Sequence, residues 1–175
     1  KQCLLTFIKG YPDDGGCEEG VSYWDCAGAS LFESLYFMQF MPKESALHLN
    51  DMQREKVKAM GQFITKMYID DLTFVNFSDA QAKNTPNINI LFPYGAYLND
   101  APMTCLAAYI GKKYNYLKYP STLFLQSGNY PKLGRELMFL SMLPQFESTK
   151  AEQPKTEEAF LQNSQIMVSR SNDWF

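Results

Sequence analysis

Residues 13–28 read DDGGCEEGVSYWDCAG, which combines acids, glycines and an aromatic pair directly before a long apolar segment. The four carboxylates can cap a helix, bind a cation or act as general acid or base. The glycines allow a sharp turn and a close approach to a ligand. Tyr23 can transfer a proton if nearby positive charge lowers the phenol pKa from its ordinary value of about 10. The alternatives are solvated or capping acids, and a Tyr23–Trp24 pair that packs on the helix.

A second stretch, FVNFSDAQAK, alternates Phe74 and Phe77 with Asn76 and Asp79. Aromatic faces stack on the C–H faces of sugars, and amide and carboxylate groups pair with sugar hydroxyls. This pattern favours a carbohydrate surface. The alternative is a loop held by two buried phenylalanines, with Asp79 as the N-cap of a helix.

A metal site is not expected in this chain. The cysteines show no CxxC spacing, His48 is the single histidine, and residues 13–28 lack the ligand spacing of an EF-hand. We expect His48 on the surface or at a helix cap. Free or buried thiols are expected, although a Cys17–Cys26 disulfide is conceivable in an oxidising compartment.

Composition limits the class of protein. The chain has 175 residues, of which 46% are hydrophobic and 20% charged, enough for one domain or a large piece of one. The net charge of -3 without a run of Lys or Arg argues against a nucleic-acid partner. No apolar run reaches the roughly 18 residues of a membrane-spanning helix. The first ten residues are too short for a signal peptide and indicate the end of a helix stopped by Gly10.

The elements that position these residues are predicted to be helices. Residues 27–41 form a helix that is apolar nearly all round, which predicts deep burial, and Pro42 ends it. Asn50 and Gln53 have the spacing of a capping box, opening a helix over 51–69. The side chains of Val57, Met60, Ile64 and Met67 are predicted to face the core of the protein.

Further helices are predicted over 87–98, over 101–117 with Asp100 as N-cap, and over 131–146, where Pro144 ends the last one. The charged stretch 147–163 is predicted to be a linker. Residues 164–175, with Ile166, Val168 and Arg170 on one face, form the only credible strand.

The fold class is therefore all-α, built from antiparallel helical hairpins, with a strand at the C-terminus. Residues 1–146 form the helical domain, 147–163 the linker and 164–175 the start of a second domain. The loops at 11–24 and 74–79 both precede helical stretches. We expect them on one rim of the hairpin stack, where they would form one site.

The segment YPDDGGCEEGVSYWDCAGASLFESL resembles the heparinase II/III-like polysaccharide lyases, which carry a Gly-Gly-Cys-(Asp/Glu)-Glu-Gly-Pro-Ser-Tyr-Trp run before a long helix. FVNFSDAQAK and NSQIMVSR also resemble stretches of that family. Val21 replaces the usual Pro and Asp25 the usual Gly. The resemblance implies a partial (α/α) toroid and the first strand of a β-sandwich, so the chain is expected to be a fragment.

The resemblance further implies β-elimination on a heparin-, heparan sulfate- or alginate-like polysaccharide, with Tyr23 as proton donor. Glu19, Trp24, Asn76 and Asp79 are expected to bind this acidic substrate. No cofactor is expected in this chain, whereas a zinc or calcium site is possible in the β-sandwich domain. A periplasmic or secreted bacterial protein is implied. The chain alone is expected to be inactive, because the family's upstream Asn/His segment and its downstream His-rich segment lie outside it.

Two alternatives stay open. The first is an (α/α)-toroid glycoside hydrolase that uses Asp14 or Glu19 with Asp79, which requires two carboxyl groups roughly 5 to 10 Å apart across a cleft. The second is a non-catalytic helical scaffold that binds glycan or protein.

Overall fold

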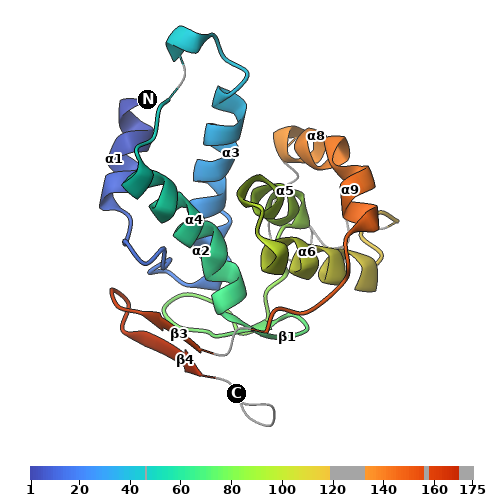
Figure 1. Cartoon of the computed structure of the whole chain (residues 1–175). Coiled ribbons are helices and arrows are strands. Elements are labelled where there is room, and N and C mark those ends of the chain that lie inside the picture. Colours follow the sequence, from blue (N-terminus) through green and yellow to red (C-terminus); the bar gives the residue numbers. More distant parts are fainter. Residues whose placement is uncertain (46, 119–132, 156–157, 170–175) are drawn as a thin grey trace.

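The computed structural model of the chain describes residues 1–45, 47–118, 133–155 and 158–169. These residues form a mainly helical protein with two small antiparallel sheets, β1–β2 and β3–β4. Figure 1 shows α1, α3 and α4 on one side of the molecule, α5, α6, α8 and α9 on the other, and the β3–β4 hairpin below the first group. No helix in the described ranges is long and apolar enough to cross a membrane.

The first group contains α1 (Gln2–Gly10), the single turn α2 (Val21–Trp24), α3 (Gly28–Met38) and α4 (Asp51–Lys66), with a 3-10 turn, η1 (Lys43–Ser45), between α3 and α4. The predicted capping box at the start of α4 is confirmed. The Asn50 side chain accepts from the Gln53 backbone N–H at 2.9 Å, and the Gln53 side chain accepts from the Asn50 N–H at 3.0 Å. The four apolar side chains predicted to face the core are all buried.

The prediction of deep burial along the whole of residues 27–41 is wrong. The helix ends at Met38, and its buried residues all lie in its first half. Phe40 and Met41 beyond it are 72% and 56% exposed. Proline disfavours helical geometry in the residue before it and lacks an N–H donor, so the helix is lost before Pro42.

The predicted helix over 51–69 is also too long, because its last residues belong to a strand. β1 (Tyr68–Asp70) pairs with β2 (Thr73–Phe74) across a turn in which Asp71 has a φ of 52°. The Asp71 carboxylate accepts from the Lys113 ammonium at 2.6 Å and from the Tyr114 hydroxyl at 2.7 Å. These hydrogen bonds, that from Lys113 first, lower the pKa of Asp71. Partners distant in sequence thus contact this turn.

The second group begins with the hairpin of α5 (Ile88–Leu98) and α6 (Ala101–Lys113). Asp100 caps α6 as predicted, since its side chain accepts from the Met103 N–H at 3.0 Å. Asn99 takes the left-handed conformation in the tight turn between the helices. The two helices pack closely at Gly95, where an added Cβ would lie 2.7 Å from the Cβ of Met103.

The helix predicted over 131–146 is two helices, α8 (Leu133–Ser141) and α9 (Leu143–Ser148). Residues 131 and 132 lie outside the described ranges. Pro144 lies in the first turn of α9, where a missing N–H costs no helical hydrogen bond. It therefore helps to begin a helix instead of ending one. Phe146 of α9 is buried against the rings of Phe92 and Phe139.

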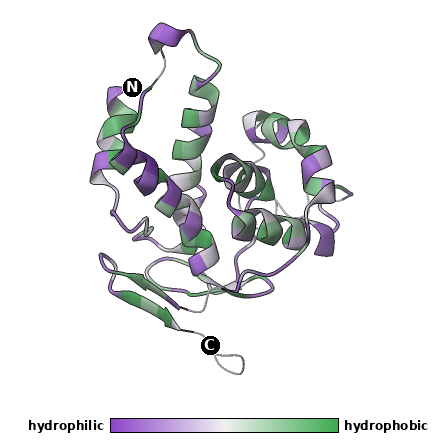
Figure 2. Ribbon diagram, in the orientation of Figure 1, coloured by the Kyte–Doolittle hydropathy of each residue, from purple (hydrophilic) through white to green (hydrophobic). Residues whose placement is uncertain are grey.

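The predicted C-terminal strand is confirmed as β4 (Ile166–Ser169), whereas Arg170 and the residues after it lie outside the described ranges. It is not the only strand. β3 (Glu158–Leu161) pairs with it, although the sequence predicts a linker over 147–163. Leu161 and Val168 are buried, and the hydrophobic residues along both strands appear in Figure 2. Leu161 is the one fully buried residue of β3, and a single buried leucine in a charged segment gives no visible period in the sequence.

Candidate functional site

Two of the four acids in the loop between α1 and α2 contact other parts of the chain. Asp13 forms an ion pair with Lys56 of α4 at 2.7 Å. The carboxylate of Asp14 accepts from the Gly16 N–H at 2.9 Å and from the Asn163 N–H of the β3–β4 hairpin at 2.8 Å. Asp14 therefore fastens the loop to the β3–β4 hairpin. The Asp13 side chain is 93% exposed in its ion pair, so the alternative of a solvated acid applies to it.

The glycines of this loop allow it to pack against the protein itself. Gly15 has a φ of 77°, and a Cβ added there would lie 2.1 Å from the carbonyl carbon of Ala59. Gly20 has a φ of 88°, and its added Cβ would lie 2.4 Å from the Cβ of Ala80. Both positions thus need glycine for conformation and for space. The close partners are protein backbone and side chain, in place of the ligand expected from the sequence.

Tyr23 and Trp24 point to different environments. Trp24 is 1% exposed, donates from its indole nitrogen to the Met60 carbonyl at 2.7 Å and stacks on the ring of Tyr94. Its ring is therefore enclosed by the protein in this structure, and the exposed stacking face expected for a saccharide is not found at Trp24. The hydrogen bond and the stacked ring instead anchor the turn that carries Tyr23. Tyr23 itself is 39% exposed.

The second polar loop contacts the first. The Gln81 backbone N–H donates to the Ser22 hydroxyl at 3.0 Å. Gly20 lies against Ala80 and the carbonyl oxygen of Phe77, which would be 2.8 Å from an added Cβ. The two loops therefore form one edge of the molecule, with the exposed Tyr23 next to one of these contacts.

Asn76 and Asp79 are exposed on the second loop. Phe74 is fully buried, and Phe77 packs edge-on against Phe63. No helix begins directly after Asp79 in this described part of the chain, so its alternative role as an N-cap is wrong. The phenylalanines hold the loop from inside, and the amide and carboxylate are left for solvent or a ligand.

A hollow of about 340 Å³ lies beside the first loop and is lined in part by Phe7, Tyr11, Glu18 and Glu19. Both glutamates are exposed. Tyr11 and Cys17 also line this hollow, and burial raises the pKa of both the phenol and the thiol. Cys17 is therefore a protonated thiol near neutral pH and a poor nucleophile.

Sequence reasoning missed the interaction that fixes the turn after Tyr23. The Arg135 side chain of α8 is fully buried and donates to the Asp25 carboxylate at 2.5 Å and to the Glu33 carboxylate at 2.8 Å. It also donates to the Asp25 carbonyl at 3.1 Å. Asp25, which stands where the resembled family usually has Gly, thus has a charged partner 110 residues away. Because the two residues are far apart in the sequence, no local pattern predicts their ion pair. The only hint in the sequence is Asp25 itself, at a position where the resembled family has Gly.

The cysteines and His48, the remaining candidate residues, do not cluster at one site. Cys3, Cys17, Cys26 and Cys105, all in the described part, are free thiols. Within the same ranges, no group of three His, Cys, Asp or Glu side chains is placed to hold a metal ion. His48 is exposed, as predicted, and lines a separate hollow between α3, α4 and α5.

No family model matches the chain, and no curated protein matches it either. The candidate site therefore rests on its own geometry: an exposed phenol on an anchored turn, two exposed glutamates beside a hollow, and an adjoining loop with an exposed amide and carboxylate. These groups can form hydrogen bonds with a polar ligand and, at Tyr23, donate a proton. Neither 11–25 nor 74–81 contains a Lys or Arg.

Proposed function

We propose that this chain contributes the proton donor and part of the saccharide-binding edge of a lyase that cleaves uronic-acid polysaccharides by β-elimination. The observation that supports this most directly is the contact between the two polar loops through Gly20, Ser22 and Gln81. Tyr23, Glu19, Asn76 and Asp79 belong to these two contacting loops, and all four are exposed.

In the proposed reaction a base removes the C5 proton of the uronate, the C4–O4 bond breaks, and a proton from the Tyr23 hydroxyl goes to the leaving O4. The products are a chain with a 4,5-unsaturated uronate at its new non-reducing end and a departing sugar on which the protonated O4 is the anomeric hydroxyl of a new reducing end. A carbanion at C5 forms only if the uronate carboxylate is neutralised, because preorganised electrostatics supplies a large part of such a rate. The two loops hold no cation of their own. We therefore propose that the neutralising group comes from outside this edge and that the chain alone is inactive.

The architecture and location belong to the same proposal. The tight helical hairpin α5–α6 and the α3–α4 pair are elements from which an (α/α) toroid is built. The β3–β4 hairpin would open a β-sandwich, where a zinc or calcium site is possible. The protein would act in the periplasm or after secretion, on a heparin-, heparan sulfate- or alginate-like substrate.

The test combines binding and product analysis. The chain should bind uronate oligosaccharides in calorimetry, and Asn76→Ala or Asp79→Ala should weaken binding by roughly two- to tenfold, the loss expected for one or two hydrogen bonds. A longer protein that contains this chain together with the neutralising group should release product with the ultraviolet absorbance of an unsaturated uronate. Tyr23→Phe should abolish this signal, while Tyr97→Phe, an exposed tyrosine on α5, should leave it unchanged. Full activity of Tyr23→Phe, or sustained cleavage by the chain alone, would contradict the proposal.

A glycoside hydrolase is the second candidate, favoured by the acids that the structure leaves exposed. Asp14 is engaged by two backbone N–H groups, so the carboxyl pair would be Glu19 with Asp79 on the two contacting loops. A hydrolase releases a reducing end without an unsaturated sugar, loses activity in Glu19→Gln and retains it in Tyr23→Phe. Binding without either product would identify a glycan-binding scaffold.

A further inference from the structure

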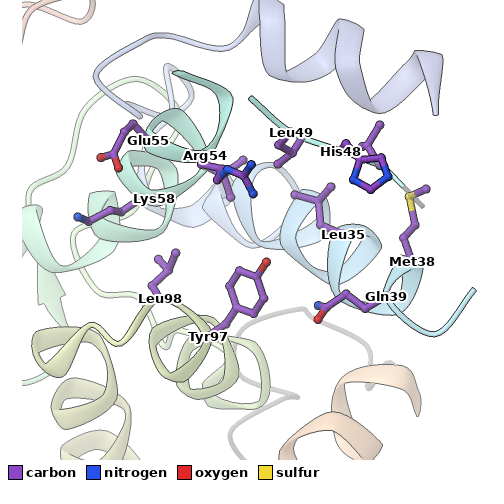
Figure 3. Close-up of a pocket in the computed structure, with 12 residues that line it drawn as sticks. Leu35, Met38, Gln39, His48, Leu49, Arg54, Glu55, Lys58, Tyr97 and Leu98 are labelled. Atoms are coloured by element: carbon purple, nitrogen blue, oxygen red, sulfur yellow. The ribbon is translucent and has the colours of Figure 1, made fainter. Parts of the chain in front are cut away.

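A second hollow of about 340 Å³ opens between α3, α4 and α5, away from the two polar loops (Figure 3). Its apolar lining includes Leu35 of α3, Leu49 before α4 and Leu98 of α5. Arg54 and Lys58 of α4 and Tyr97 of α5 add polar groups. Its size is within the range of small-molecule sites, which typically combine an apolar lining with a few polar groups.

The charges that line this hollow favour an anion. Arg54 and Lys58 flank a single acid, Glu55, so the lining is net positive even when His48 is neutral. Among the residues that the structure describes, the Arg54 side chain pairs only with Asp51, at 3.6 Å, and the two side chains are 66% and 102% exposed. An ion pair this long and this exposed is weak, so the guanidinium is available to another carboxylate. In Figure 3 Arg54 and the Tyr97 ring project into the same space from opposite helices.

We propose that this hollow binds a small amphipathic carboxylate, with its apolar body against the leucines and its carboxylate at Arg54. Burial of the apolar body supplies most of the affinity, because each methylene removed from water contributes favourably. The guanidinium fixes the orientation, since its planar fork matches the two oxygens of a carboxylate. This site is separate from the saccharide edge, and its existence does not depend on the lyase proposal.

The test uses three small molecules that share a ten-carbon alkyl tail and differ in their head groups: decanoate, decanol and decylamine. In calorimetry with the whole chain, below the concentration at which decanoate forms micelles, decanoate should bind most tightly and decylamine most weakly. In methyl NMR spectra the signals of Leu35, Leu49 and Leu98 should shift on addition of decanoate, whereas those of Leu143 in α9 should not. Equal binding of decanoate and decylamine, or shifts spread evenly over the leucines, would overturn the proposal.

Matched charge variants locate the carboxylate. Arg54→Gln should weaken decanoate binding by roughly two- to fivefold, the effect of removing a partly exposed ion pair. Decanol binding should change by less than about twofold, because the apolar lining is intact. Lys66→Gln, in the last turn of the same helix and outside the hollow, should leave both affinities unchanged. An equal loss of decanoate and decanol affinity in Arg54→Gln, or no loss at all, would refute the assignment.

Discussion

Arg135 is predicted to be the most sensitive charged position in the described part of the protein. Its side chain is buried and donates to two carboxylates, to the Ser30 hydroxyl and to the Asp25 carbonyl, at distances from 2.5 to 3.1 Å. The contact joins α8 to the turn between α2 and α3. Because that turn follows Tyr23 directly, the same arginine that stabilises the fold also fixes one edge of the candidate site.

The size of the effect follows from what the substitution leaves behind. Arg135→Met keeps an apolar side chain of similar length but leaves the Asp25 carboxylate, which is 9% exposed, without its cation. Removing one partner of a buried ion pair costs about 3–5 kcal/mol, whereas a domain is stable by only about 5–15 kcal/mol. Asp25→Asn should cost less, about 1–3 kcal/mol, because Arg135 still has the Glu33 carboxylate.

Urea unfolding followed by circular dichroism measures these free energies. The double variant Arg135→Met with Asp25→Leu should be less destabilised than the sum of its single variants, because replacing a buried ion pair with apolar groups is often close to neutral. Arg54→Met is the control, since that side chain is exposed and should cost less than about 0.5 kcal/mol. A loss below about 1 kcal/mol for Arg135→Met, or strict additivity in the double variant, would refute the reasoning.

Three further predictions concern the loops and their surroundings. Gly20→Ala should lower the free energy of unfolding by roughly 1–3 kcal/mol, because alanine would be strained at this positive φ and would clash with Ala80. Gly10→Ala is the control, since the space around Gly10 is open. Equal losses of stability in the two variants would contradict this prediction. The hydrogen bond from Lys113 lowers the pKa of Asp71 in the folded protein. The contribution of Asp71 to the free energy of unfolding is therefore complete above the ordinary Asp pKa of 3.8 and is lost as the pH falls through the lower, folded value. Asp71→Asn should therefore lose less stability on acidification, and parallel pH curves would be evidence against the pairing. Burial raises the pKa of Cys17, so iodoacetamide should label the exposed Cys26 first by mass spectrometry, and faster labelling of Cys17 would contradict its burial.

Local signals in the sequence predicted the parts of the fold that depend on a few neighbouring residues. The capping box at Asn50 and the cap at Asp100 are confirmed because a cap is a hydrogen bond between residues two or three apart. The buried face of α4 is confirmed because helical periodicity fixes which side chains share a face. The same logic failed at Pro144, since a proline ends one helix or begins the next depending on where the chain turns.

A shared rim for the two polar loops was predicted from the alternation of loops and helices, but the direct contact between the loops was not. From the sequence, Gly20 was expected to let the loop approach a ligand closely. In the structure it instead leaves room for the side chain of Ala80. Trp24 reads as a partner of Tyr23, yet the two side chains separate into core and solvent, because adjacent residues on a helical turn point in different directions.

The sequence by itself determined that this chain is mainly helical, where its caps lie and which loops carry polar and aromatic groups. Only the tertiary structure decided which of those groups face solvent. It left Tyr23, Glu19, Asn76 and Asp79 on the surface, whereas Asp14 and Trp24 hold the first loop in place. It also paired Asp25 with Arg135 and placed Arg54 across a hollow from Tyr97. The physical reason is range: caps and periodicity act within a few residues, whereas burial and ion pairing depend on which distant segments share a space.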